Sequence, residues 1–172
     1  MPSRIRLEDR ECPLSTTAQH AGEWWTLLIL HDAFDGYTRF DQFQQNLNIS
    51  TSMLTARLKT LVADGLLERR LYQDKPARHE YVLTERGRSL RPVIVALAAW
   101  GNGHLAPRER SMILVDAASG EEVEPVLVDA RTGRHLDDSE AFVFAAGPAA
   151  GTAMRSRYAE LHRQRLGRAD AQ

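Results

Sequence analysis

The strongest constraint on the fold is the stretch from residue 38 to residue 87, in which two short amphipathic segments precede a basic hairpin pattern. In the first segment, Phe40, Phe43 and Leu47 recur at the i, i+3 and i+7 spacing of one buried helical face. The pattern then breaks, and Ser50 is a favourable N-cap residue for a second helix. Two short helices joined by a tight turn, with a hairpin after them, predict a winged helix-turn-helix.

The second helix is expected to have one apolar face and one small polar face. It ends near Gly65, which suits a left-handed C-cap. Its apolar positions are Leu54, Leu58, Leu61 and Val62. The opposite positions are Ser52, Thr55, Ala56 and Lys59. Because small side chains let a helix backbone approach base edges, this face favours insertion into a major groove. A solvated helix face is the alternative interpretation of the same pattern taken alone.

The hairpin pattern after this helix predicts a basic wing. Strands are expected at 66–72 and 79–83, joined by the polar, Pro-containing loop 73–78, which is too long for a two-residue turn. Between residues 54 and 91 there are nine Lys or Arg against five acidic residues, whereas the whole chain has a net charge of −1. The positive charge is therefore concentrated where DNA phosphates would lie.

Seven side chains are expected to contact DNA. Base edges or nearby phosphates are the predicted contacts of Ser52, Thr55 and Lys59. Phosphates at the groove edge are the predicted contacts of Thr51 and Arg57. The adjacent minor groove or backbone is the predicted contact of two wing residues, Lys75 and Arg78.

Several separate blocks of the chain match one family in order and spacing. They run from Cys12-Pro13 to Trp100-Gly101 and include 23–30, Arg39-Phe40, 53–59, 64–69 and 80–87. On these blocks the chain resembles the HxlR-type transcriptional regulators, which are relatives of the MarR proteins. The resemblance implies a homodimeric winged-helix protein that binds double-stranded DNA at inverted-repeat operators as a repressor or activator. A response to a small-molecule effector or to oxidants is a further expectation.

The single cysteine, Cys12, precedes Pro13 and a cluster, Ser15-Thr16-Thr17, that is expected to cap the first helix. A thiol near a helix N-terminus is favoured as thiolate, which raises its reactivity. Some HxlR-type regulators sense electrophiles or oxidants through a cysteine in this region, so the resemblance makes Cys12 a candidate redox sensor. The alternative, a small buried apolar side chain without a redox role, is the more common state of a free cysteine.

Two apolar helices flank the helix-turn-helix. The first is expected from about Thr17 to Phe34, with Trp24 and Trp25 assigned to core and dimer packing rather than to an aromatic ligand site. The second begins at Thr84, a possible cap, and ends near Gly101. Pro92 predicts that this helix either restarts or bends. Its apolar seam comprises Leu90, Val93, Ile94, Leu97 and Trp100. The resemblance implies that the two helices form the dimer interface.

The character of the chain changes after residue 105, so two domains are expected, 1–105 and 106–172. In the second, 114–120 recurs as 127–133, each copy reading as a strand that runs into a Gly-containing turn. This predicts a small antiparallel sheet of three or four strands from 112 to 144, followed by a last helix from 152 to 166. The fold class is thus α+β: a winged helix-turn-helix, a C-terminal antiparallel β unit and a terminal helix.

Longer HxlR-type proteins can carry cysteine pairs in comparable turns. The matching residues of this chain are Asp116, Ser119, Asp129 and Thr132. Because four such oxygen donors make a poor zinc site, no metal is expected. A metal-free β unit for dimerisation or scaffolding is the preferred interpretation, and a surface that docks a ligand or protein is the alternative.

Other functional classes find little support in the sequence. It has no nucleophile-elbow, phosphate-loop, dinucleotide-binding or zinc-hydrolase motif, so we expect no enzyme activity and no cofactor. It also has no apolar run of transmembrane length, and its charged first residues are unlike a secretory signal, so a cytoplasmic protein without membrane contact is expected. The remaining alternative is a winged helix that serves protein interaction, with the β unit as the docking surface.

Overall fold

The computed structural model describes residues 12–21, 23–137, 139 and 141–169. The chain forms two compact units. One unit spans Thr17–Pro125, and the other joins the described residues up to Thr16 to those from Val126 onward. The domain boundary expected after residue 105 stays a prediction.

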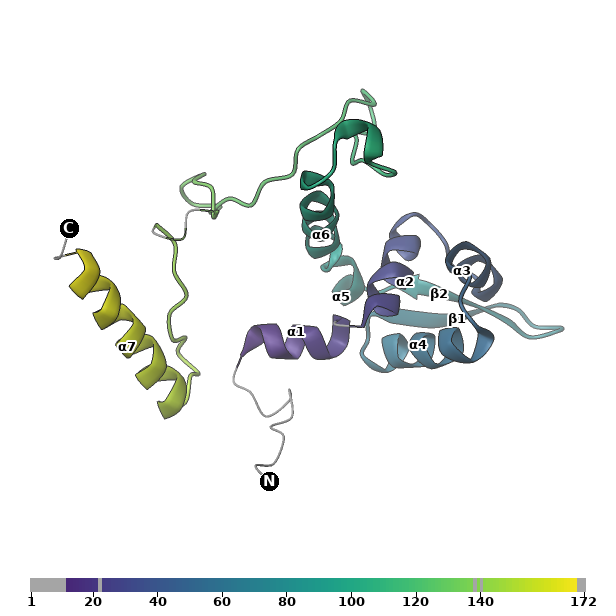
Figure 1. The fold of residues 1–172 in the computed structure, drawn as a ribbon. Coiled ribbons are helices and arrows are strands. Elements are labelled where there is room, and N and C mark those ends of the chain that lie inside the picture. Colours follow the sequence, from purple (N-terminus) through teal and green to yellow (C-terminus); the bar gives the residue numbers. More distant parts are fainter. Residues whose placement is uncertain (1–11, 22, 138, 140, 170–172) are drawn as a thin grey trace. The chain divides into compact units, whose positions relative to one another are not determined.

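The order of helices and strands is that of a winged helix-turn-helix with flanking helices (Figure 1). The elements up to the wing are α1 (Pro13–Ala21), α2 (Trp24–Phe34), α3 (Phe40–Leu47), α4 (Thr51–Ala63), β1 (Leu67–Gln73) and β2 (Arg78–Leu83). After the wing come α5 (Glu85–Arg88), α6 (Arg91–Gly103), the short 3-10 helix η2 (Pro107–Glu109) and α7 (Thr152–Ala169).

One hydrophobic core lies between α2, α3, α4 and the start of the wing. Its buried side chains are Ile29, Leu30, Phe43, Ile49, Leu54, Leu58, Leu61, Leu66 and Leu67. Three of the apolar positions expected for the second helix, Leu54, Leu58 and Leu61, belong to this core, as does Phe43 of the first. Their burial fixes α4 with its opposite face directed away from the core.

The signals that bound the helix-turn-helix in the sequence are confirmed. The Ser50 hydroxyl accepts a hydrogen bond from the Met53 amide at 3.3 Å, which caps the N-terminus of α4. Asn48 adopts the left-handed conformation at φ 48° in the turn between α3 and α4. Gly65 also has a positive φ, 68°, at the point where α4 ends.

The wing is a two-stranded antiparallel sheet, as expected. Its register pairs Leu67 with Leu83 and Leu71 with His79. The edge of β2 is extended by an isolated bridge between Arg39 and Glu80, so the chain just before α3 pairs with the wing. Figure 1 shows the loop between the strands projecting beyond α3 and α4.

The first apolar helix differs from its prediction in two ways. It is broken into α1 and α2, and α1 begins at Pro13 rather than near Thr17. Ser15 is therefore inside α1 and buried, so it does not cap the helix; the Ser15 amide donates to the Cys12 carbonyl at 2.9 Å. Of the two tryptophans assigned to core and dimer packing, Trp25 packs against the core, whereas Trp24 is 80% exposed and lies outside it. Packing of Trp24 in a dimer stays a prediction.

The helix after the wing restarts rather than bends. Thr84 caps α5, its hydroxyl accepting from the Gly87 amide at 3.0 Å, and α6 begins at Arg91 with Pro92 in its first turn. Pro92 is tolerated there because the first turn of a helix needs no amide donor from it. Much of the α6 seam remains exposed, including Val93 (41%), Leu97 (48%) and Trp100 (71%).

The sheet predicted between 112 and 144 does not form in the described residues of that segment. The two repeats instead make separate hairpin turns, each closed by one bridge: Val115 with Glu122, and Val128 with His135. The arms are too short to pair further, and Val126 (55%) and Leu127 (62%) are left exposed. The two turns also fall in different compact units. The last helix is confirmed as α7, which begins at Thr152 and extends to Ala169.

The repeated turns share most of their hydrogen bonds. Asp116 accepts the amide of Gly120, and Asp129 that of Gly133, both at 2.8 Å through their backbone carbonyls. The Asp116 carboxylate also accepts the Ser119 and Ala118 amides, which lowers its pKa; the pKa of Asp129 is lowered by the Thr132 hydroxyl and the Arg131 amide. These carboxylates therefore stabilise turns, and no grouping of three or more metal-binding side chains occurs in the part of the chain that is described.

None of the described helices combines the length and the apolar character that a membrane crossing would require.

Candidate nucleic-acid interface

The outer face of α4 gathers the three residues predicted to approach bases. Ser52, Thr55 and Lys59 are all exposed. At 100° of rotation per residue they lie within about 60° of one another around the helix. The same geometry places them on the side away from the buried Leu54, Leu58 and Leu61. The helix therefore presents a small, polar and cationic surface to solvent.

The hydroxyl groups at the start of α4 are held in defined positions. Thr55 Oγ1 donates to the Thr51 carbonyl at 2.7 Å, and Thr51 Oγ1 accepts from Gln44 Nε2 at 2.8 Å. The Ser52 and Ser50 hydroxyl oxygens lie 3.3 Å apart. Since a hydroxyl oxygen has two lone pairs, Thr55 can still accept a hydrogen bond from a base edge.

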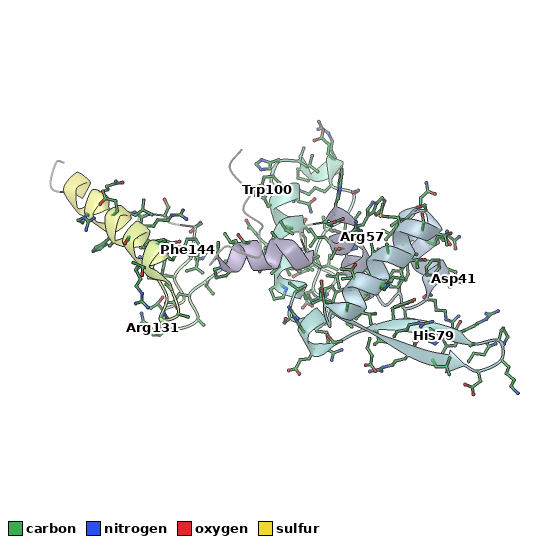
Figure 2. The ribbon with its side chains drawn as sticks, turned by 90° about the horizontal axis from the view of Figure 1, so that it is seen from below. Asp41, Arg57, His79, Trp100, Arg131 and Phe144 are labelled. Atoms are coloured by element: carbon green, nitrogen blue, oxygen red, sulfur yellow. The ribbon has the colours of Figure 1, made fainter. Side chains whose placement is uncertain are left out.

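Arg57 has a different environment from the one expected at the groove edge. Its guanidinium forms an ion pair with the Glu23 carboxylate, and only 22% of its side chain is exposed. Arg57 lies three residues after Leu54 and four before Leu61, so it borders the buried face; it is labelled on α4 in Figure 2. The ion pair fixes α4 against the N-cap residue of α2, while the phosphate contact of Arg57 stays a prediction.

The cations of the wing differ in their partners, and Arg69 lies 3.0 Å from His79 Nδ1 on the neighbouring strand. Arg70 pairs with Glu68 at 2.8 Å, which raises the pKa of Arg70 and lowers that of Glu68. Lys75 and Arg78, the predicted wing contacts, are both exposed at the loop. Because exposed cations reach phosphates without opening an ion pair of their own strand, the loop is better placed for DNA than Arg70.

Two residues that shape this surface were missed by the sequence prediction. Gln44 holds the Thr51 hydroxyl across the turn, and the Arg39 guanidinium lies 5.0 Å from the centre of the Tyr72 ring. The second contact links the N-cap of α3 to the wing. The Arg39-Phe40 dipeptide was noted in the sequence, but nothing in it indicates that Arg39 contacts Tyr72, a strand residue more than thirty positions later.

A polar pair joins α2 to α3, and of its two residues Asp32 is buried and Asn46 is exposed. Both carboxylate oxygens of Asp32 lie near Asn46 Nδ2, at 3.0 and 3.1 Å. Burial raises the pKa of Asp32, although the bond from Asn46 opposes this. Since Asn46 is near the end of α3, this pair helps to set the position of the turn that leads into α4.

Cys12 immediately precedes α1 with its side chain half-buried. Amide groups of Ser15 and Leu14 point at the thiol and lower its pKa. The structure therefore gives Cys12 the helix N-terminal environment expected for a reactive thiol, while its role as a sensor stays a prediction.

Comparison with known proteins places this architecture among transcription factors. A family model described as HxlR-like helix-turn-helix matches residues 21–109. The HTH-type transcriptional regulator Rv3095 of Mycobacterium tuberculosis is 44% identical over 116 residues, which cover 67% of this chain and 73% of that protein. The solved structure of PA1374 from Pseudomonas aeruginosa, a candidate transcription factor, is 43% identical with a TM-score of 0.63, and the match covers 85% of this chain and 99% of that one.

A shorter match is found to the redox regulator HypR in its oxidised form. The two chains are 34% identical with a TM-score of 0.51, over 55% of this chain and 99% of HypR. A protein described as a redox regulator is thus among the solved structures that resemble this chain.

Proposed function

Because the chain belongs to the HxlR-like helix-turn-helix family of transcriptional regulators, we propose that it binds an inverted-repeat operator as a homodimer. The observation that carries the proposal is the exposed polar face of α4, opposite its buried leucines. In this arrangement α4 enters the major groove, and Ser52, Thr55 and Lys59 contact base edges or nearby phosphates. Thr51 binds a phosphate at the groove edge.

Exposed apolar side chains on α2 and α6 support the homodimer. Trp24 (80%) and Leu28 (45%) are exposed on α2, as are Val93, Leu97 and Trp100 on α6. Figure 2 shows Trp100 well away from the wing residue His79. Large apolar side chains left in water mark association surfaces, so a second copy of the chain would cover them without blocking the wing.

The function is tested by selecting bound duplexes from a random pool and by measuring how the affinity for the selected duplex depends on salt. A dimeric regulator that binds DNA phosphates should select a two-fold symmetric consensus sequence, and its affinity should fall steeply as the salt concentration rises. No enrichment and a slope near zero would favour the alternative, a winged helix that serves protein interaction.

The wing is tested by Arg78→Ala. Loss of one phosphate contact should weaken binding to all sequences and make the salt slope shallower by about one unit. Arg108→Ala is the matched control, because Arg108 is an exposed arginine in η2, outside the wing. Equal slopes for the two variants would remove the wing loop from the interface.

We further propose that Cys12 makes the regulator responsive to oxidants or electrophiles. The lowered pKa of its thiol and the likeness to HypR support this role. In the folded protein, the alkylation rate should reach its midpoint below the ordinary thiol pKa of about 8.5, since the thiolate is the reacting form. The same chain in denaturant is the control. A midpoint unchanged by folding would contradict an activated thiol.

A further inference from the structure

The C-terminal helix α7 is the most basic element outside the winged helix-turn-helix. Its 18 residues, Thr152–Ala169, hold five arginines and one glutamate. The preceding segment, 111–151, has the opposite charge, with eight acidic residues and two arginines. The positive charge is therefore a property of this helix and not of the C-terminal part in general.

The arginines of α7 whose side chains are described differ in their contacts. Arg155 donates to the carbonyls of Ala150 and Pro148 at 2.8 and 2.9 Å, which ties the start of the helix to the segment before it. Arg163 pairs with Glu160. Arg157 and Arg165 are both exposed, and Arg157 lies over the Tyr158 ring at 5.7 Å, a contact that leaves its charge in place.

The spacing of Arg157 and Arg165 puts both on one side of α7. Eight residues of helix correspond to about 12 Å along the axis and to about 80° of rotation. Two guanidinium groups at that spacing can each donate a pair of hydrogen bonds to a phosphate. A membrane surface is a poorer partner, because an interfacial helix needs a broad apolar face, and the part of α7 whose side chains are described, 152–165, offers only Met154, Tyr158 and Leu161 as large apolar residues.

We propose that α7 is a second DNA-binding element, which contacts the phosphate backbone through Arg157 and Arg165 without reading sequence. The inference rests on the proposed function, since bound operator DNA supplies the phosphates. Because α7 and the winged helix belong to one chain, α7 meets this DNA at high effective concentration, and contacts too weak to act alone add to the overall affinity.

The test compares Arg157→Gln/Arg165→Gln with a control that removes the same charge, Arg108→Gln/Arg131→Gln. The control residues are exposed and lie outside α7. Glutamine keeps a good helix propensity, and circular dichroism verifies that the helical content is unchanged. The probe is a long duplex that carries the selected operator with random flanking sequence on both sides.

The α7 variant should show a salt slope shallower by about one to two units, with an affinity about tenfold lower at physiological salt, while the control keeps the parental slope. The selected consensus should not change. Equal slopes for the α7 variant and the control would overturn the role of α7. If the affinity of the unsubstituted protein did not depend on salt, the proposed DNA binding itself would be overturned. The test therefore distinguishes failure of the α7 proposal from failure of the proposed function.

Discussion

Replacing Gly87 by alanine should lower the free energy of unfolding by about 3 kcal/mol or more, because the site has no room for a side chain. A Cβ atom built on Gly87 would lie 2.1 Å from the backbone carbonyl oxygen of Leu66. That oxygen cannot move freely, since it accepts the Thr84 amide at 3.1 Å where the wing begins. The strain should therefore reach both the capped turn of α5 and the first strand of the wing.

Thermal and urea unfolding measure the effect, with Gly101→Ala as the control. Gly101 lies in α6 with no atom near enough to touch an added Cβ, so alanine there should be neutral or stabilise by up to about 1 kcal/mol. For a unit of this size each kcal/mol corresponds to roughly 4–8 °C in Tm. A Gly87→Ala protein as stable as the parent would show that the α5 turn does not pack tightly on the wing.

Replacing Thr55 by glutamate should reduce operator affinity by at least about 100-fold, which corresponds to about 2.7 kcal/mol. The substitution puts a carboxylate where α4 meets base edges and phosphates, and like charges at such short range cost several kcal/mol. Because Thr55 is exposed and its hydroxyl bonds only within the helix, the folded protein should tolerate the change.

Thr60→Glu is the control for Thr55→Glu. Both threonines are exposed on α4, and the Thr60 hydroxyl donates to the Ala56 carbonyl at 3.1 Å, four residues back, as Thr55 does to Thr51. The two lie about 140° apart around the helix. Affinity for the selected operator, measured at several salt concentrations, should fall only a few-fold for Thr60→Glu. Equal losses for the two variants would mean that the charge acts at long range and that α4 has no specific DNA face.

Local signals allowed much of the fold to be predicted. The caps at Ser50 and Thr84 and the left-handed Gly65 depend on the residue itself and its near neighbours, and all three are confirmed. The wing strands were predictable for the same reason. Pro92 limited the following helix to two possibilities, and the structure selects the restart.

The errors arose where distant contacts decide the outcome. The repeats at Asp116 and Asp129 were expected to join into one sheet, yet each turn satisfies its own backbone groups and forms a single bridge. The partner of Arg57, Glu23, is the N-cap residue just before α2 and is far away in the sequence, so this ion pair was not predictable from helix spacing alone. Its position beside Leu54 and Leu61 was the signal that Arg57 borders the core.

The exposure of Trp24 is a third case. A sequence pattern distinguishes apolar from polar faces, but it does not tell whether an apolar face is covered by the same chain or by another. The assignment of the outer face of α4 has the same limit, because spacing identifies a polar face and only a bound partner reveals its use.

The central claim, that α4 lies in the major groove with the wing beside it, is tested most directly by affinity cleavage. Since the chain has one cysteine, Cys12→Ser followed by Ser52→Cys gives a single attachment site for an iron chelate that cleaves nearby DNA. Cleavage should occur in the major groove of both half-sites, symmetrically, with centres about 10 bp or a multiple of this apart. A chelate at Lys75→Cys should cut the adjacent minor groove. Absence of cleavage from both positions on DNA that the labelled protein still binds would contradict the claim.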